Sequence, residues 1–363
     1  MKKQKILTLL GISLLITLFY LNWKSIIEGF RDADYGLVAI AGAFWFIGGF
    51  LRATRWRFLL NSGEEIYLGV PFAIRALFGA FFLESIGPKI SSDIYRGTLV
   101  WTTSDGRINF SKSFGVIVFE RFLDFFLKLL IAIAGIILIG EAVSELGGGS
   151  TAAVLFSFFL LCGFATFLFL LSREEVATAI SEKWIKIAGP KKDSLAGRID
   201  PSELSRLANT FVSLAKSKKH LASSGALTLG VFLADLATWI LIFAAVDAKA
   251  DFFMLAFIMS VVTLAVFISM FPGGYGVREL AGTVALVWAG VDPGIAVTAF
   301  MALRLFNLLM NIGPGGGFFI FTSLKMQEKA VTVSKAVENP ASNVITKGSS
   351  RDKTQIEKFS ADQ

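Results

Sequence analysis

The chain has 363 residues, of which 54% are hydrophobic and 17% are charged, and it carries a formal net charge of +7. Soluble domains carry about 25% charged residues, so this composition predicts a membrane protein rather than a soluble one. One cysteine excludes a disulfide within the chain, and one histidine argues against histidine-rich metal sites. In a membrane protein the basic excess predicts contact with anionic lipids before nucleic acid.

Seven segments are long and apolar enough to be transmembrane helices, which need about 20 mostly apolar residues. They are residues 6–21, 36–51, 114–140, 151–171, 221–246, 252–271 and 295–322. The first segment follows a basic start and lacks a small-x-small cleavage site, so we expect an uncleaved span and not a signal peptide. The pattern predicts an all-α, polytopic integral membrane protein.

Two further apolar runs, residues 71–86 and 280–290, are short for a full span. Helix-breaking residues lie beside both runs: Gly87 and Pro88 follow the first, and Pro272, Gly273, Gly274, Tyr275 and Gly276 precede the second. Runs of this length are typical of re-entrant segments, which enter and leave the membrane on one face. We therefore expect seven or eight transmembrane helices with one or two re-entrant hairpins, and the side of the C-terminus stays open.

Basic residues are concentrated at the start of the chain, just after residue 51 and in residues 172–220, which predicts that these segments are cytoplasmic. The expected location is the cell membrane, with a cytoplasmic N-terminus. Residues 325–363 are polar and poor in aromatic residues, which predicts a disordered tail after a membrane domain of residues 1–324. The order of spans, Gly/Pro breaks and short runs hints at an internal repeat, whose interface would hold a binding site.

Charged and amide side chains lie inside several apolar segments, where a charge costs roughly 2.5–3.5 kcal/mol at the bilayer centre. They are Arg75, Glu84, Glu120, Arg121, Asp124, Lys128, Asp235, Arg304 and Asn307. Glu120, Asp124 and Lys128 follow one another at intervals of four, so one helix face carries all three, with Asp124 placed to pair with Lys128. Either this stripe satisfies itself between helices, or its carboxylates orient arginines toward a cavity.

The sequence GPKISSDIYR, at residues 87–96, joins a helix break to capping and basic residues. Ser91, Ser92 or Asp93 is expected to cap a new helix and to leave free N–H groups at its N-terminus. Lys89 and Arg96 add cations beside that N-terminus, which would make it an anion site suited to phosphate. Ordinary capping and anchoring at the membrane surface is the alternative.

The sequence PGGYGVREL, from residue 272, combines the same features. Gly276 permits positive φ, and Arg278 and Glu279 stand at the start of a short helix, where glutamate favours the helix dipole. A plain turn needs only one or two of these features, so we expect a re-entrant element that faces a polar groove. P-loop, HExxH, GxSxG and GxGxxG motifs are absent from the sequence, so we expect no enzyme activity and no cofactor.

Four motifs in this order resemble the flippase-like membrane domain of the lysylphosphatidylglycerol synthetase family. They are Arg52-Ala53-Thr54-Arg55-Trp56, GPKISSDIYR, the ERFLD sequence from Glu120 to Asp124, and PGGYGVRE followed by Arg304. The resemblance covers roughly residues 1–324. It implies a domain that translocates a lipid, which in two-part members is made by a separate soluble aminoacyl-transferase domain. The tail from residue 325 is too short and too polar to be that domain.

Taken together, the residues and the resemblance predict a lipid translocase for an anionic phospholipid or a polyprenyl-linked or glycolipid head group. Its partners would be membrane lipids and a separate lipid-modifying enzyme. The candidate head-group ligands are Arg96, Arg278, Arg304, Lys89 and Arg75, and the candidate orienting residues are Glu84, Asp93, Glu120, Arg121, Asp124, Asp235, Glu279 and Asn307. A membrane-embedded lipid-linked transferase and a non-catalytic scaffold of a lipid pathway are the alternatives.

Overall fold

The computed structural model describes residues 2–62, 68–87, 89–104, 107–144, 201–249, 251–269 and 274–338, and the regular elements in these ranges are all helices. They are α1 (Lys2–Arg31), α2 (Tyr35–Leu60), α3 (Val70–Ile86), α4 (Lys89–Thr103), α5 (Phe110–Ser144), α8 (Pro201–Lys216), α9 (Lys218–Ala245), α10 (Phe252–Ser269), α11 (Val277–Trp288) and α12 (Pro293–Glu338). The all-α prediction is confirmed. The span predicted at residues 151–171 lies outside the described residues.

Three described helices are long and apolar enough to cross a membrane: Tyr35–Leu60, Lys218–Ala245 and the Pro293–Leu324 part of α12. They match the spans predicted at residues 36–51, 221–246 and 295–322, so the protein is a polytopic membrane protein. The segments predicted at residues 6–21 and 114–140 lie within α1 and α5, and α10 contains a shorter apolar helix, Phe252–Val266. The total number of spans and the re-entrant hairpins stay predictions.

Local sequence explains where several helices begin. Asp34 caps α2, because its side chain accepts from the N–H groups of Gly36 and Leu37. Ser217 caps α9 in the same way. Pro71 lies in the first turn of α3, where its missing N–H group costs no intrahelical hydrogen bond.

Two helices extend beyond the limits predicted from the sequence. α2 continues past residue 51 to Leu60, so Arg52 and Arg55 lie inside a helix and not in a loop. α12 is helical to Glu338, whereas the sequence predicts disorder from residue 325. The reason is the same in both places, because neither extension contains the glycine or proline that would end a helix.

The capping prediction for α4 is wrong. α4 begins at Lys89, so Ser91, Ser92 and Asp93 lie inside the helix and do not cap it. The break between α3 and α4 is short, since the N–H group of Gly87 still bonds the carbonyl of Leu83 at the end of α3. The chain is therefore helical again, in α4, before it reaches the residues that were expected to cap that helix.

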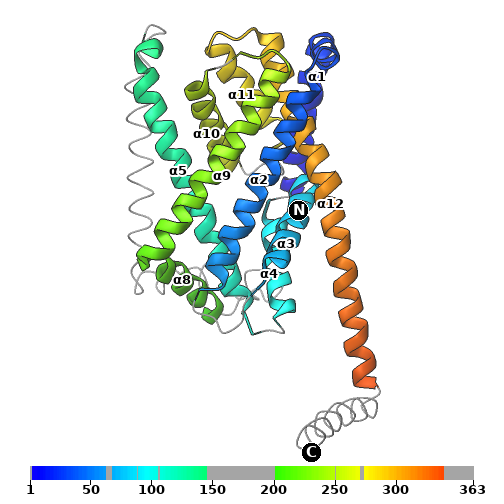
Figure 1. Ribbon diagram of the computed structural model, residues 1–363. Coiled ribbons are helices and arrows are strands. Elements are labelled where there is room, and N and C mark those ends of the chain that lie inside the picture. Colours follow the sequence, from blue (N-terminus) through cyan, green and yellow to red (C-terminus); the bar gives the residue numbers. More distant parts are fainter. Residues whose placement is uncertain are drawn as a thin grey trace, which may run out of the picture.

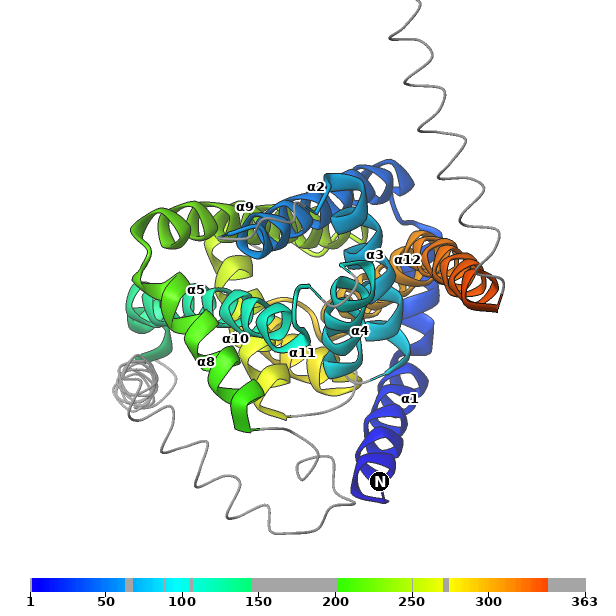
Figure 2. The ribbon, with the colours of Figure 1, turned by 90° about the horizontal axis from the view of Figure 1, so that it is seen from below.

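The described helices form one bundle, shown in Figure 1. α2 packs along α9, α5 packs against α10 and α8, and α3 packs against both α12 and α2. Figure 2, seen from below, shows α2 and α9 on one side, with α5, α10 and α11 opposite and α3, α4 and α12 at one end. The C-terminal part of α12 extends beyond the other described helices (Figure 1).

Two large hydrophobic clusters of described residues hold the bundle together, and a small third cluster joins α1 to α12. One large cluster joins α9, α10 and α12 through Trp239, Phe243 and Phe300, and the other joins α2, α5 and α8 through Trp56 and Phe119 with their neighbours. Glycine allows one of the closest helix contacts, because a Cβ at Gly315 would lie 3.0 Å from the Phe78 carbonyl oxygen of α3.

Candidate functional site

A cavity of about 250 Å³ lies between the two hydrophobic clusters and takes lining residues from α2, α3, α4, α5, α9, α10, α11 and α12. Its described lining includes seven basic side chains and four acidic ones. The basic residues are Arg52, Arg55, Arg96, Arg121, Lys128, Arg278 and Arg304, and the acidic residues are Glu84, Glu120, Asp124 and Asp235. The described lining therefore contains more basic than acidic side chains.

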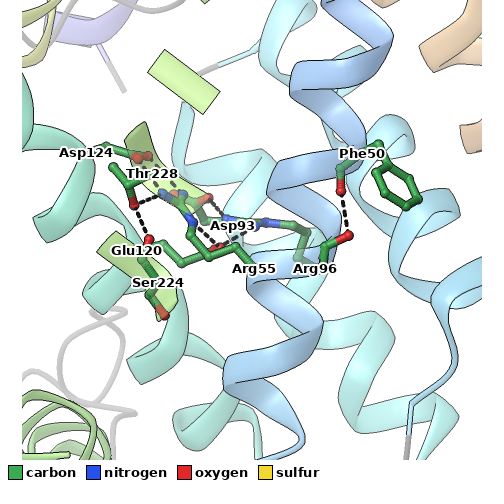
Figure 3. Close-up of polar contacts among 9 residues, drawn as sticks. Phe50, Arg55, Asp93, Arg96, Glu120, Asp124, Ser224 and Thr228 are labelled. Atoms are coloured by element: carbon green, nitrogen blue, oxygen red, sulfur yellow. Dashed lines mark hydrogen bonds and ion pairs between the residues drawn. The ribbon is translucent and has the colours of Figure 1, made fainter. Parts of the chain in front are cut away.

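Arg55 is the centre of the largest ion-pair network that lines this cavity. Its Nε donates to Glu120 Oε1 at 3.1 Å, and its Nη1 donates to Asp124 Oδ1 at 2.6 Å. The same Nη1 donates to Thr228 Oγ1 at 2.6 Å, so one guanidinium joins α2, α5 and α9 (Figure 3). Arg55 is 2% exposed, and its fork-like donors suit a pair of carboxylates.

Arg96 extends the network from Glu120 into α4. Its Nη1 donates to Glu120 Oε2 at 3.1 Å, and its Nη2 donates to Asp93 Oδ1 at 3.0 Å. Arg121 also donates to Asp93 Oδ1, at 2.9 Å. The face of the Trp56 ring lies 5.3 Å from the Arg96 guanidinium carbon, which adds a cation–π contact. Three guanidinium groups and three carboxylates thus form one connected network, whose formal charges cancel.

A second ion pair lines the cavity where α2 packs along α9. Arg52 Nη2 lies 2.5 Å from Asp235 Oδ2, and the two side chains are 25% and 27% exposed. Arg52 and Arg55 are three residues apart on α2, so both face the cavity from one side of the helix. The two side chains of this pair are more exposed than those of Arg55 and Glu120.

The chain between α10 and α11 places a third charged group at the cavity. Gly276 adopts φ of 76°, and its N–H donates to Glu279 Oε2 at 2.8 Å, which fixes the start of α11. Glu279 Oε1 lies 3.7 Å from Arg304 Nε. The Arg304 guanidinium also covers the Tyr275 ring, with its carbon 3.8 Å from the ring centroid. Arg304, a predicted head-group ligand, therefore lies beside Glu279, a predicted orienting residue.

Arg278 lines the same cavity from the first turn of α11. In the part of the chain that the structure describes, it has no ion-pair partner, unlike Arg52, Arg55, Arg96 and Arg121. Arginine remains charged at all ordinary pH values. Arg278 thus contributes uncompensated positive charge at the cavity wall.

The structure brings most of the predicted site residues together. Arg96, Arg278, Arg304, Glu84, Glu120, Arg121, Asp124, Asp235 and Asn307 all line the cavity. Asp93 pairs with Arg96, and Glu279 lies beside Arg304, although neither carboxylate is part of the cavity lining. Gly274, Tyr275, Gly276 and Gly87 form the described parts of the two helix breaks.

The remaining predicted residues lie elsewhere or outside the described residues. The Arg75 guanidinium lies over the Phe321 ring of α12, and Arg75 is not part of the cavity lining. Pro88, Pro272, Gly273 and the side chain of Lys89 lie outside the described residues. The hydrogen bonds described for Asp124 come from Arg55 on another helix, and Lys128 acts on the same carboxylate through its positive charge.

Sequence reasoning missed Arg55, Arg52 and Thr228 as site residues. The two arginines follow the predicted end of the second span, so the sequence places them in a cytoplasmic segment, although both belong to the first of the four family-like motifs. One signal was present in the sequence, since Trp56, Phe58, Leu59 and Leu60 continue the apolar pattern after them. Among the described residues no group of three or more His, Cys, Asp and Glu side chains is arranged to hold a metal ion.

Comparison with known proteins gives a match over most of the chain. Residues 6–315 match the family described as the lysylphosphatidylglycerol synthase TM region. UPF0104 membrane protein PH1989 of Pyrococcus horikoshii is 23% identical over 326 residues, which cover 86% of this chain and 96% of that protein. Glycosyltransferase AglD of Haloferax volcanii is 25% identical over 369 residues, which cover 93% of this chain. The matched region spans 55% of AglD.

Proposed function

Because this chain belongs to the lysylphosphatidylglycerol synthase transmembrane-region family, we propose that it is a lipid translocase whose cavity accepts an anionic lipid head group. The proposed site is the cationic cavity between the two hydrophobic clusters. The proposed location is the cell membrane, with a cytoplasmic N-terminus, as the distribution of basic residues favours.

The excess of basic over acidic side chains in the cavity supports this function. Each charge inside a membrane protein is costly unless it is paired or solvated, and the Arg55 network shows how the fold pairs its structural arginines. Arg278 has no such pair among the described residues, and Arg304 lies 3.7 Å from its carboxylate. A phosphate would supply the missing negative charge, since the guanidinium fork binds phosphate oxygens through two parallel hydrogen bonds.

The surroundings of the described carboxylates favour a protein that binds a lipid and does not cleave a bond in it. Glu120 and Asp124 accept hydrogen bonds from Arg55, and Asp93 accepts from Arg96 and Arg121. Each of these carboxylates is engaged by an arginine from another helix, which is the position of a structural partner and not of a group that acts on a bound lipid. We therefore propose transfer of an unchanged lipid, with any chemical modification carried out by a separate enzyme.

The class of lipid follows from the charge of the cavity and from the relatives. An anionic phospholipid such as phosphatidylglycerol fits the family description. A lipid-linked sugar is the second candidate, because one relative is named a glycosyltransferase. Both lipids present a phosphate to the cavity, so the same arginines would bind either one.

Leaflet transfer in proteoliposomes tests the proposal. Purified protein is reconstituted with trace fluorescent phosphatidylglycerol, phosphatidylcholine or polyprenyl phosphate, and dithionite reports the fraction of probe in the outer leaflet. We expect faster transfer of an anionic probe, lost in Arg278→Gln and Arg304→Gln. Arg31→Gln is the matched control, because Arg31 is an exposed arginine in the last turn of α1.

Two results would overturn the proposal. Transfer of all three probes at the rate of empty liposomes would favour a scaffold role. Equal acceleration of phosphatidylcholine and the anionic probes, unchanged in the two arginine variants, would show that the cationic cavity does not select the lipid.

A further inference from the structure

Tyr275 lies in the short segment between α10 and α11, and it contacts the end of α3, where the chain breaks before α4. It stands between Gly274 and Gly276, which both adopt positive φ, of 63° and 76°. Non-glycine residues rarely adopt this conformation, so the two glycines allow the tight path that presents Tyr275 to the interior. The side chain makes one contact through its ring and another through its hydroxyl group.

The hydroxyl group contacts the end of α3. The O–H of Tyr275 donates to the backbone carbonyl of Ser85, which lies in the last turn of that helix. The last four carbonyls of a helix lack intrahelical partners. Tyr275 therefore satisfies an acceptor that the break after α3 leaves open, and it ties that break to the one before α11.

The ring holds the guanidinium of Arg304. The guanidinium carbon lies 3.8 Å from the ring centroid, which is close to face-to-face contact. Glu279 attracts the Nε side of the same group from 3.7 Å. Stacking on a ring fixes the plane of a guanidinium group, so this contact restricts the orientation of Arg304.

From this geometry we infer that Tyr275 is a positioning residue for head-group binding. Resting on the proposed function, this inference adds the device that orients Arg304 toward an anionic head group. The ring sets the plane of the guanidinium, and the hydroxyl group fixes the ring by its bond to Ser85. The arginine is thus oriented before the lipid arrives, so less conformational freedom is lost on binding.

Substitutions at Tyr275 separate the two contacts. Tyr275→Phe keeps the ring and loses the hydroxyl group, and Tyr275→Leu loses both. Binding of short-chain phosphatidylglycerol to the detergent-solubilised full chain gives the dissociation constant, and binding of short-chain phosphatidylcholine gives the selectivity. We expect the dissociation constant for phosphatidylglycerol to rise about threefold in Tyr275→Phe and about tenfold in Tyr275→Leu, with selectivity falling in the same order.

Tyr35 provides a matched control. Its hydroxyl group also donates to a backbone carbonyl, that of Phe30, at 2.8 Å, but its ring is exposed at the start of α2. Tyr35→Phe and Tyr35→Leu are expected to bind phosphatidylglycerol as the wild-type protein does. Thermal unfolding of each variant, measured in the same detergent, identifies any loss of the folded state.

A double-mutant cycle shows whether Tyr275 acts through Arg304. In an Arg304→Gln background, Tyr275→Leu is expected to add no further loss of affinity, because no guanidinium is left to position. A full tenfold loss in that background would overturn the inference while wild-type binding still supports the proposed function. Absence of selective phosphatidylglycerol binding by the folded wild-type protein would overturn the inference together with the proposed function.

Discussion

Arg55 Nε lies 3.1 Å from Glu120 Oε1, although 65 residues separate the two in the chain. Both side chains are buried, at 3% exposure, and the contact joins α2 to α5 on the wall of the cavity. Removal of one partner from a buried ion pair leaves a charge without compensation. The folded state of the bundle therefore depends on the Arg55 guanidinium.

Arg55→Met is expected to destabilise the protein by about 3–5 kcal/mol, because Glu120 and Asp124 would keep their charges without this partner. Thermal unfolding in detergent should show a clear drop in Tm. Addition of Asp124→Asn should recover part of that drop. Lys249→Met is the control, since the Lys249–Asp247 pair is 89% and 82% exposed and should leave Tm unchanged. An Arg55→Met protein with the wild-type Tm would contradict this assignment.

Arg52→Met should lower Tm much less than Arg55→Met. Its ion pair with Asp235 is about a quarter exposed, so solvent screens it and a loss of about 1 kcal/mol is expected. The exchanged pair, Arg52→Asp with Asp235→Arg, should regain the Tm that either single exchange loses. Equal losses in the double and single variants would show that the two side chains do not act as a pair.

Glu279→Gln should strengthen the binding of phosphatidylglycerol. The amide oxygen of glutamine can still accept from the Gly276 N–H, so α11 should begin at the same place. The negative charge 3.7 Å from Arg304 Nε is removed, which leaves Arg304 more attractive to an anion. A dissociation constant about fivefold lower is expected by titration in detergent. An unchanged or higher value, with normal Tm, would refute the competition between Glu279 and the head group.

Gly315→Leu should separate α12 from α3, because the new side chain would meet the Phe78 carbonyl oxygen and the Phe82 backbone nitrogen. Overpacking of this kind costs about 1–3 kcal/mol, so Tm should fall by several degrees. Gly317→Leu is the control on the same helix, since nothing lies within 4 Å of a Cβ there. Equal Tm values for the two variants would argue against close packing at Gly315.

The sequence was most informative where the physics is local or compositional. Long apolar segments predicted the all-α membrane fold, and charges within those segments predicted many of the cavity residues, among them Glu120 and Asp124. The cost of a charge in lipid makes such residues conspicuous in a single sequence. Arg304 and Glu279 were each singled out because they stand beside apolar runs, but the sequence did not predict that they lie next to each other.

Contacts between residues that are distant in the chain were harder to predict from the sequence. A spacing of four residues relates Asp124 to Lys128 on one helix, but it carries no information about Arg55 on another. The break after α3 was predicted correctly at Gly87, yet the helix resumes too soon for Ser91, Ser92 or Asp93 to cap it. Only the packing of α4 on α5 reveals that Asp93 instead accepts from Arg121.

The internal neutrality of the Arg55 network has an electrical consequence. Moving one elementary charge across a membrane potential of 100 mV changes the energy by about 2.3 kcal/mol. The three carboxylates cancel the three guanidinium groups, so a membrane potential exerts no net force on this cluster. If the proposed transfer takes place, the membrane potential would act on the charge of the lipid head group and not on this network.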